Sequence, residues 1–280
     1  MSTTPARARV PRSYLFVPAS RPERIGKAIA AGADAVIVDL EDAVAPDAKT
    51  EARNGMTAVW RSLQAQADSA GVALQLRVNG ADTTYFADDL AFCQMQAVQA
   101  IVLPKADKAS LAALRAVLPD TPCHALLETA AGFVDLPDVA RAPGVTRLLF
   151  GSIDLMFDLD VVDDDLPLHA CRSALVLHSR AAGLPAPVDG VCTAIGDAQA
   201  LAADTLRGRR FGFGAKLLIH PNQVAGVHEA LAPSAAEVSW ARRVVGQATA
   251  AQGAAIAVDG KMVDRPVLER AQRIVEAAAS

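Results

Sequence analysis

Short apolar runs of strand length alternate along the chain with longer segments that are compatible with helices. Eight such pairs follow one another, and eight is the number that closes a barrel of parallel strands. The expected strands are Tyr14 to Val17, Ala35 to Leu40, Leu74 to Val78, Ala100 to Leu103, Cys123 to Leu127, Arg147 to Phe150, Ala186 to Asp189 and Ala215 to Ile219. The pattern therefore predicts an α/β protein, a (β/α)8 TIM barrel.

The C-terminal part of the chain departs from this alternation. Ser234 and Glu237 have the spacing of a capping box, which predicts that a new helix begins there. A turn at Asp259-Gly260 precedes a last helix from Pro266 onward. The expected parts are a (β/α)8 barrel over residues 1–231 and a C-terminal helical extension over residues 232–280.

The bulk composition excludes several classes of function. The chain has 280 residues, close to the size of one barrel of this kind, and 52% of them are hydrophobic, enough for a large core. A net charge of −4 gives no general attraction to nucleic acid or to an anionic membrane. The four cysteines are scattered, and no signal peptide or long apolar run stands out. These features predict a soluble, cytoplasmic protein with reduced thiols.

Polar residues follow most of the expected strands, where barrels of this kind gather their catalytic groups. Glu128 and Asp154 come at the ends of two successive strands. Neighbouring parallel strands lie roughly 4.8 Å apart, so two such carboxylates can hold one hard cation from the same side. The sequence therefore predicts a Mg²⁺ site, and a cation such as Arg77 beside it suits the binding of an oxyanion.

Structural roles compete with catalytic ones at several strand ends. Asp39, Glu41 and Asp42 are equally well explained as partners of Lys or Arg from adjacent loops. Lys105 is a solvated charge, or a Schiff-base lysine if burial lowers its pKa. His220 stands at a strand end, and its position next to a proline favours a loop-shaping role over that of a general base.

Several motifs follow one another in an order that is typical of a known family, and they span nearly the whole chain. The motifs are Leu15-Phe16-Val17-Pro18, Gly32 to Val44, Leu76-Arg77-Val78-Asn79, Val102-Leu103-Pro104-Lys105, Leu127-Glu128-Thr129-Ala130, Phe150 to Leu155, Lys216 to Pro221 and Asp259 to Asp264. Together they resemble the citrate lyase β-subunit-like (CitE-like) family within the HpcH/HpaI aldolase superfamily.

The resemblance implies an activity and roles for the strand-end residues. Glu128 and Asp154 would be the protein ligands of Mg²⁺, and Arg77 would bind the carbonyl or enolate oxygen of the reacting acyl group. The implied enzyme is a carbon–carbon lyase that cleaves a 3-hydroxyacyl-CoA, such as malyl-CoA or citramalyl-CoA, into acetyl-CoA and a 2-oxo acid. Backbone N–H groups around Gly151 and Ser152 would hold the remaining carboxylate oxygen.

The resemblance also implies further substrate contacts and a partner. Asp42 is expected in the substrate site, and Arg21 and Lys27 are candidates for the coenzyme A phosphates, although surface charge on a first helix explains them equally well. Asp264 matches an acid that serves as the base from the C-terminal extension of a neighbouring subunit. This predicts a homo-oligomer, a trimer or a hexamer. The structural alternative is that Asp264 N-caps the helix that begins near Pro266.

Other functions stay open at this point. The β-subunit of a citrate lyase complex would act on a citryl group that is bound to an acyl carrier. A pyruvate-type aldolase would share the metal ligands but would not bind coenzyme A. A catalytically inactive scaffold is disfavoured because every expected acidic and cationic position is occupied. The expected partner is a small acyl-CoA substrate, with no nucleic acid and no membrane.

Overall fold

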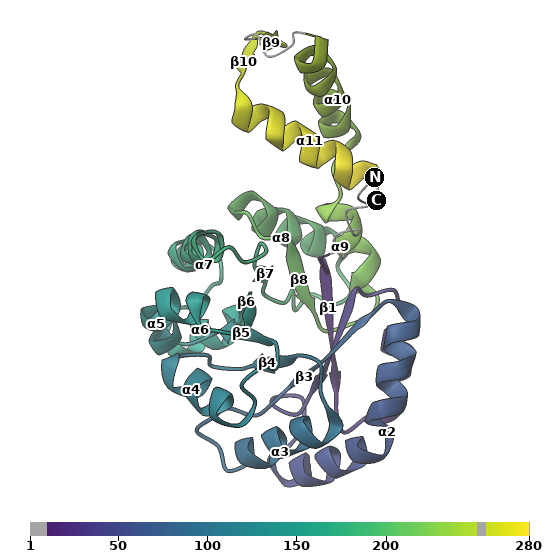
Figure 1. The fold of residues 1–280 in the computed structure, drawn as a ribbon, viewed down its shortest axis with the longest axis vertical. Coiled ribbons are helices and arrows are strands. Elements are labelled where there is room, and N and C mark those ends of the chain that lie inside the picture. Colours follow the sequence, from purple (N-terminus) through teal and green to yellow (C-terminus); the bar gives the residue numbers. More distant parts are fainter. Residues whose placement is uncertain (1–9, 251–255, 280) are drawn as a thin grey trace. The chain divides into compact units, whose positions relative to one another are not determined.

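The computed structural model describes residues 10–250 and 256–279 (Figure 1). Eight parallel strands form a closed barrel in chain order, and β1 pairs with both β2 and β8. The strands are β1 (Ser13–Pro18), β2 (Ala35–Asp39), β3 (Ala73–Arg77), β4 (Ile101–Leu103), β5 (Cys123–Leu127), β6 (Val145–Phe150), β7 (Val188–Asp189) and β8 (Ala215–Leu218). The (β/α)8 prediction is confirmed. Strand β7 is shorter than expected because Pro187 has no N–H to donate to the sheet.

Helices cover the outside of the barrel (Figure 1). They are α1 (Pro22–Ile29), α2 (Lys49–Ala70), α3 (Phe86–Gln96), α4 (Lys108–Val117), α5 (Ala130–Arg141), α6 (Ser152–Asp158), α7 (His169–Ala181), α8 (Ala198–Phe211) and α9 (Gln223–Leu231), with short 3-10 turns η1 (Pro46–Ala48) and η2 (Leu166–Leu168). The short helix α6 is an addition to the alternating pattern and places its first turn directly after β6. None of the helices in the described residues has both the length and the apolar character of a membrane span.

Apolar side chains from all sides of the barrel fill its interior. Tyr14, Ile37, Val102 and Leu149 are among the buried members of this cluster. At the carboxyl end of the strands the cluster continues into residues that also line a pocket. These residues are Phe16, Leu126, Val191 and Leu217.

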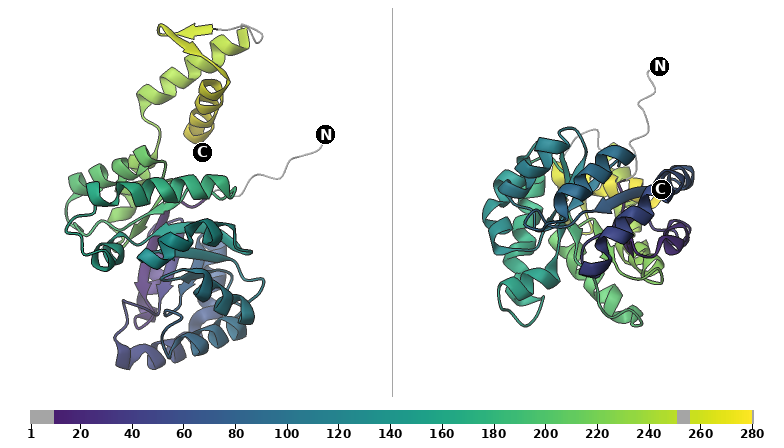
Figure 2. Two further views of the ribbon diagram at one scale, coloured as in Figure 1. Left: turned by 90° about the vertical axis from the view of Figure 1, so that its left-hand side faces the viewer. Right: turned by 90° about the horizontal axis from the view of Figure 1, so that it is seen from below.

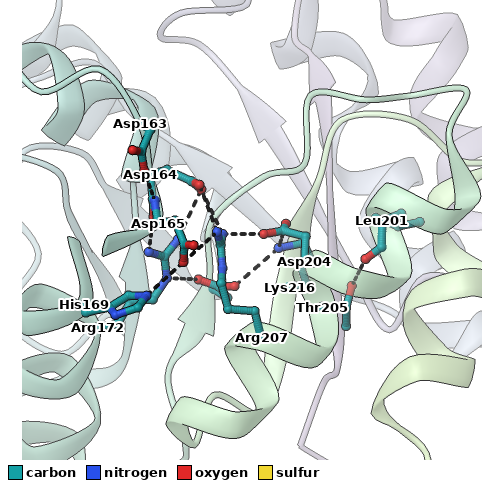
Figure 3. A network of polar contacts seen from close by, with 11 residues as sticks. Asp163, Asp164, Asp165, His169, Arg172, Leu201, Asp204, Thr205, Arg207 and Lys216 are labelled. Atoms are coloured by element: carbon teal, nitrogen blue, oxygen red, sulfur yellow. Dashed lines mark hydrogen bonds and ion pairs between the residues drawn. The ribbon is translucent and has the colours of Figure 1, made fainter. Parts of the chain in front are cut away.

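A closed ring of six charged side chains ties strands β7 and β8 to helices α7 and α8 and to the loop after α6 (Figure 3). The nitrogen–oxygen distances around the ring are Lys216–Asp189 3.4 Å, Asp189–Arg172 3.5 Å, Arg172–Asp164 3.2 Å, Asp164–Arg207 3.0 Å and Asp204–Lys216 2.5 Å, and Arg207 also pairs with Asp204. Lys216 and Arg172 are each only 1% exposed. Positive and negative groups alternate, so every buried charge has an opposite neighbour on each side.

Residues Glu229–Ser280 form a second compact unit. It contains α10 (Ala235–Ala250), β9 (Ile256–Val258), β10 (Lys261–Val263) and α11 (Arg265–Ala279), which Figure 2 shows from a second side. The division falls within α9, between His228 and Glu229, close to the boundary expected after residue 231.

Two details of this unit test the sequence interpretation. The expected capping box is present, because the Ser234 N–H donates to Glu237 Oε2 at 2.8 Å and the Glu237 N–H donates to Ser234 Oγ at 3.2 Å. The extension contains the expected helices, α10 and α11, and in addition an antiparallel hairpin of β9 and β10 that the sequence did not predict. Its turn residues Asp259 and Gly260 both have positive φ, 52° and 72°, as a tight two-residue hairpin turn requires. Its three-residue strands are too short to show an alternating pattern.

The charged ring predicts a large effect of removing one partner. Lys216→Met is expected to lower the free energy of unfolding by about 3–5 kcal/mol, because Asp189 and Asp204 lose a buried counter-ion. Urea unfolding followed by circular dichroism measures this change. Lys108→Met is the matched control, since Lys108 pairs with Asp135 at the surface and its loss should have a far smaller effect. Equal effects of the two substitutions would contradict a special role for the ring.

Candidate active site

A pocket of about 410 Å³ opens at the carboxyl ends of the barrel strands. The structure brings six of the predicted site residues together in its lining: Asp42, Arg77, Glu128, Gly151, Ser152 and Asp154. Three other predicted residues are not part of this lining within the described chain: Arg21, Lys27 and Asp264.

Arg77 is held rigidly at the end of β3 by the end of β2. Its Nε and Nη2 donate to the two carboxylate oxygens of Asp39, at 2.7 and 2.6 Å. Nη1 lies 2.9 Å from Glu41 Oε2 and donates to Asp42 Oδ2 at 3.1 Å. The guanidinium also packs over the Phe16 ring, 4.7 Å from its centre. Burial alone would lower the pKa of Arg77, but the three carboxylates outweigh it and raise the pKa, so the group is permanently cationic.

The loop after β2 is shaped by hydrogen bonds that keep its carboxylates in place. Asp39 accepts from the backbone N–H groups of Glu41 at 2.9 Å and Ala43 at 3.0 Å. The Lys49 ammonium donates to the carbonyl oxygens of Leu40 at 3.0 Å and Glu41 at 2.8 Å. Asp39 therefore has the ion-pairing role that the sequence offered as the structural alternative.

Glu128 stands at the end of β5 and is 1% exposed. One of its oxygens accepts a hydrogen bond from the Lys105 backbone N–H at 2.8 Å. A Cβ on Gly151 would meet the Glu128 Cβ at 2.5 Å, so this close packing requires glycine although the φ of Gly151 is an ordinary −92°. Burial, followed by the neighbouring negative charge of Glu41, raises the pKa of Glu128 well above its usual range.

Lys105 connects the arginine side of the pocket with Glu128. Its Nζ lies 3.4 Å from Glu41 Oε1, while its backbone adopts a positive φ of 47° that is uncommon for a side chain of this size. Burial would lower the pKa of Lys105, but Glu41 and Glu128 outweigh burial and raise it. A Schiff-base lysine needs a lowered pKa, so this environment argues against that role. The sequence placed Lys105 and Glu41 at strand ends without showing that they form this bridge.

The first turn of α6 supplies the other side of the pocket. Asp154 lies in this turn, and Ser152, the first residue of the helix, is 1% exposed with no hydrogen-bond partner for its hydroxyl among the described residues. The Ala130 N–H at the start of α5 donates to Asp158 Oδ2 at 2.6 Å, which joins the two helices that follow β5 and β6. A buried hydroxyl without a partner in a pocket is suited to bind a polar ligand atom.

The donor set fits a divalent metal ion. The carboxylates near the pocket are Asp39, Glu41, Asp42, Glu128 and Asp154. In the described part of the chain, the cations beside them are Arg77, Lys105 and Lys49, so negative charge is in excess. No group of three or more Asp, Glu, His or Cys side chains forms a complete cage within the described residues. Two carboxylates, with further oxygens from substrate or water, are a common arrangement for Mg²⁺.

The remaining predicted residues lie elsewhere. Arg21 precedes α1 and Lys27 lies in its last turn, both exposed. His220 Nδ1 accepts from the Asn222 N–H at 3.2 Å, which agrees with the loop-shaping role expected for it. Asp264 is in the second unit, where its Oδ1 accepts from the Val267 N–H at 3.1 Å and caps α11.

Comparison with known proteins identifies the family. The model of the HpcH/HpaI aldolase/citrate lyase family matches residues 12–221. The chain belongs to this family. The resemblance inferred from the motifs is thereby confirmed, and the pocket of this family member lies within the matched region.

Individual relatives are similar over nearly their whole length. A (3S)-malyl-CoA thioesterase of Cereibacter sphaeroides is 36% identical, with 96% of this chain and 97% of the relative covered. A citrate lyase subunit beta-like protein of Deinococcus radiodurans is 34% identical, with coverages of 94% and 96%. The crystal structure of CitE from Mycobacterium tuberculosis in complex with magnesium, acetoacetate and coenzyme A matches with a TM-score of 0.85 and 31% identity, over 98% of this chain and all of that one.

The contact between Gly151 and Glu128 predicts a metal-binding defect. Gly151→Ala is expected to weaken Mg²⁺ binding at least about tenfold, because the new methyl group displaces the Glu128 carboxylate. Isothermal titration calorimetry with Mg²⁺ measures the affinity. Gly55→Ala is the control, since a Cβ there meets nothing within 4 Å and should leave Mg²⁺ binding unchanged. An unchanged affinity in Gly151→Ala would argue against Glu128 as a ligand.

Proposed function

We propose that this protein is a Mg²⁺-dependent carbon–carbon lyase. Its substrate is a 3-hydroxyacyl-CoA such as malyl-CoA or citramalyl-CoA, which it cleaves into acetyl-CoA and a 2-oxo acid. The observation that carries this proposal is the rigidly held cation Arg77 in one pocket with the carboxylates of Glu128 and Asp154. The relatives named for malyl-CoA and citrate lyase, and the magnesium and coenzyme A in the similar CitE structure, support it.

Each part of the pocket has a task in this reaction. Mg²⁺ held by Glu128 and Asp154 would supply a Lewis acid for the carboxylate and hydroxyl oxygens of the acid half of the substrate. When the C–C bond breaks, its electron pair moves toward the thioester, and Arg77 stabilises the negative charge that develops on the thioester oxygen. Because Asp39 fixes Arg77 in advance, little reorganisation is needed as this charge forms. The Ser152 hydroxyl would donate to a carboxylate oxygen of the acid half.

Proton transfer completes the chemistry. In the cleavage direction the hydroxyl of the acid half releases a proton to solvent water as it becomes the oxo group. The carbon that becomes the acetyl methyl group takes up a proton, so the two transfers balance. We assign the exchange at this methyl group to Asp264 of the partner subunit. Its side chain is exposed, and one carboxylate oxygen is engaged in capping α11, so both roles offered by the sequence are compatible. The active protein would then be a homo-oligomer, for example a trimer or a hexamer.

The remaining assignments concern coenzyme A and location. Arg21 and Lys27 stay candidates for the coenzyme A phosphates because both are exposed cations on α1 and its preceding loop. A cytoplasmic location is favoured by cysteines that are all free in the structure, as a reducing compartment requires.

Hydrolysis of the thioester is a second candidate activity. It is favoured by the identity of 36% to a protein named for (3S)-malyl-CoA hydrolysis. The two activities leave different products, since a lyase releases acetyl-CoA and glyoxylate from malyl-CoA whereas a thioesterase releases malate and free coenzyme A. Product analysis by mass spectrometry therefore separates them in a single experiment.

Loss of a metal ligand should abolish the lyase reaction. Asp154→Asn is expected to lower kcat/KM with malyl-CoA or citramalyl-CoA at least about 100-fold, because the amide no longer supplies a negative ligand. Formation of acetyl-CoA with glyoxylate or pyruvate is the measured signal. Asp68→Asn, at an exposed position of α2, is the matched control and should retain activity. Equal activity of both variants would refute the assigned metal site.

Mixing two inactive variants tests where Asp264 acts. Asp264→Asn and Asp154→Asn should each be inactive alone. Coexpression should restore activity, to about a quarter of the wild-type value at random mixing, because some sites then combine an intact barrel with an intact Asp264 from a partner. No recovery, with mixed oligomers demonstrated by differential tags, would mean that Asp264 acts within its own chain or not at all.

A further inference from the structure

The pocket has a charged side and an apolar side. The charged residues come from β2, β3, β5 and α6. The apolar wall consists of Phe16 on β1, Val191 two residues after β7, and Leu217 on β8, with Ile219 at its outer edge. Since β7, β8 and β1 are neighbours in the barrel, these side chains form one continuous surface. Further apolar residues of the lining, Leu126, Phe150 and Ile153, come from β5, β6 and α6.

The deep part of this wall is the upper layer of the barrel core. Leu217, together with Leu126 from β5, is 2% exposed and belongs to the buried cluster inside the barrel. Phe16 and Val191 pack against the same cluster. Ile219, in contrast, is 38% exposed at the rim. A substrate group that reaches the deep wall therefore leaves water and meets mainly hydrocarbon.

Arg77 is already bound to carboxylates of the protein. Besides the thioester oxygen, it has little capacity to bind a carboxylate substituent of the acid half. Of the residues that the structure describes, Arg77 is the one cationic side chain in the pocket lining. Two of its nitrogens are bound to Asp39 and the third to Asp42, and one face of the guanidinium is covered by Phe16. A carboxylate placed against the wall would be buried without a cationic partner, which is strongly unfavourable.

We propose that the apolar wall of Phe16, Val191 and Leu217 selects the acid half of the substrate. The selected acid half carries a small apolar substituent, as in citramalyl-CoA, whose product is pyruvate. The carboxymethyl substituent of a citryl thioester, whose product is oxaloacetate, is rejected. This inference rests on the proposed lyase function and specifies its substrate class. Burial of the methyl group favours citramalyl-CoA. Desolvation of an unpaired carboxylate disfavours the citryl thioester.

The rates at which the protein cleaves three thioesters test the selectivity and the lyase function together. With Mg²⁺ present, kcat/KM for citramalyl-CoA should exceed that for citryl-CoA at least about 100-fold. Malyl-CoA, which has a hydrogen atom in place of the substituent, serves as a reference for activity. Cleavage of citryl-CoA within a few-fold of citramalyl-CoA would overturn the selectivity and leave the lyase function standing. If none of the three is cleaved, the lyase function fails, and the binding measurement below decides the inference alone.

Binding of the acid halves gives a readout that does not depend on turnover. In calorimetric titrations at constant free Mg²⁺, pyruvate should bind at least about tenfold more tightly than oxaloacetate, because the two differ only by the carboxylate that would face the wall. Equal affinities, or tighter binding of oxaloacetate, would overturn the inference.

A charge on the wall should reverse the preference. Val191→Arg supplies a cation at a half-buried position, and its long side chain can place the guanidinium in the pocket while its stem covers the apolar wall. Relative to Val191→Met, a control of similar length without charge, it should bind oxaloacetate at least about tenfold more tightly. Thermal unfolding and Mg²⁺ titration verify that both variants are folded. The same oxaloacetate affinity in two folded variants would show that the wall does not contact the acid half.

Discussion

The ion pair between Asp39 and Arg77 organises the whole rim of the barrel. The two residues are register partners on adjacent strands, so the pairing of β2 with β3 places carboxylate and guanidinium side by side. Asp39 also binds two N–H groups of the following loop, and thereby directs Glu41 and Asp42 toward the same arginine. From Glu41 the contacts continue through Lys105 to Glu128. Arg77, the proposed oxyanion-binding cation, and Glu128, a proposed metal ligand, are thus joined by one chain of polar contacts.

Two clusters of charged side chains in the protein differ in their balance of positive and negative groups. The ring around Lys216 alternates three cations with three carboxylates and is neutral, as expected of a group of charges that holds sheet and helices together. The rim has more carboxylates than cations, and burial raises the pKa of Glu41 to about 7 although Arg77 opposes this. Such an excess is unfavourable for the protein alone and becomes favourable when a divalent cation binds. The imbalance supports the proposal that the rim is the functional site.

The sequence predicts those features that depend on local pattern and fails where distant segments meet. Strand-length apolar runs predict all eight strands, and because parallel strands end at one rim, Glu128 and Asp154 could be assigned to one pocket. The charged ring could not be predicted, because Asp164, Asp204 and Lys216 come from separate segments whose contacts depend on helix packing. The hairpin was missed because three-residue strands leave no alternation, and only the turn at Asp259-Gly260 signalled it.

The arrangement of the pocket separates chemistry from selectivity. Groups suited to bond cleavage stand on β2, β3, β5 and α6, whereas β7, β8 and β1 present hydrocarbon. In a barrel, each strand end contributes its side chain to the mouth largely independently of the others, so one side can change while the opposite side stays fixed. Relatives named for different reactions can therefore share a metal site and differ in the wall. For this chain the apolar wall, more than the carboxylates, determines which 2-oxo acid is released.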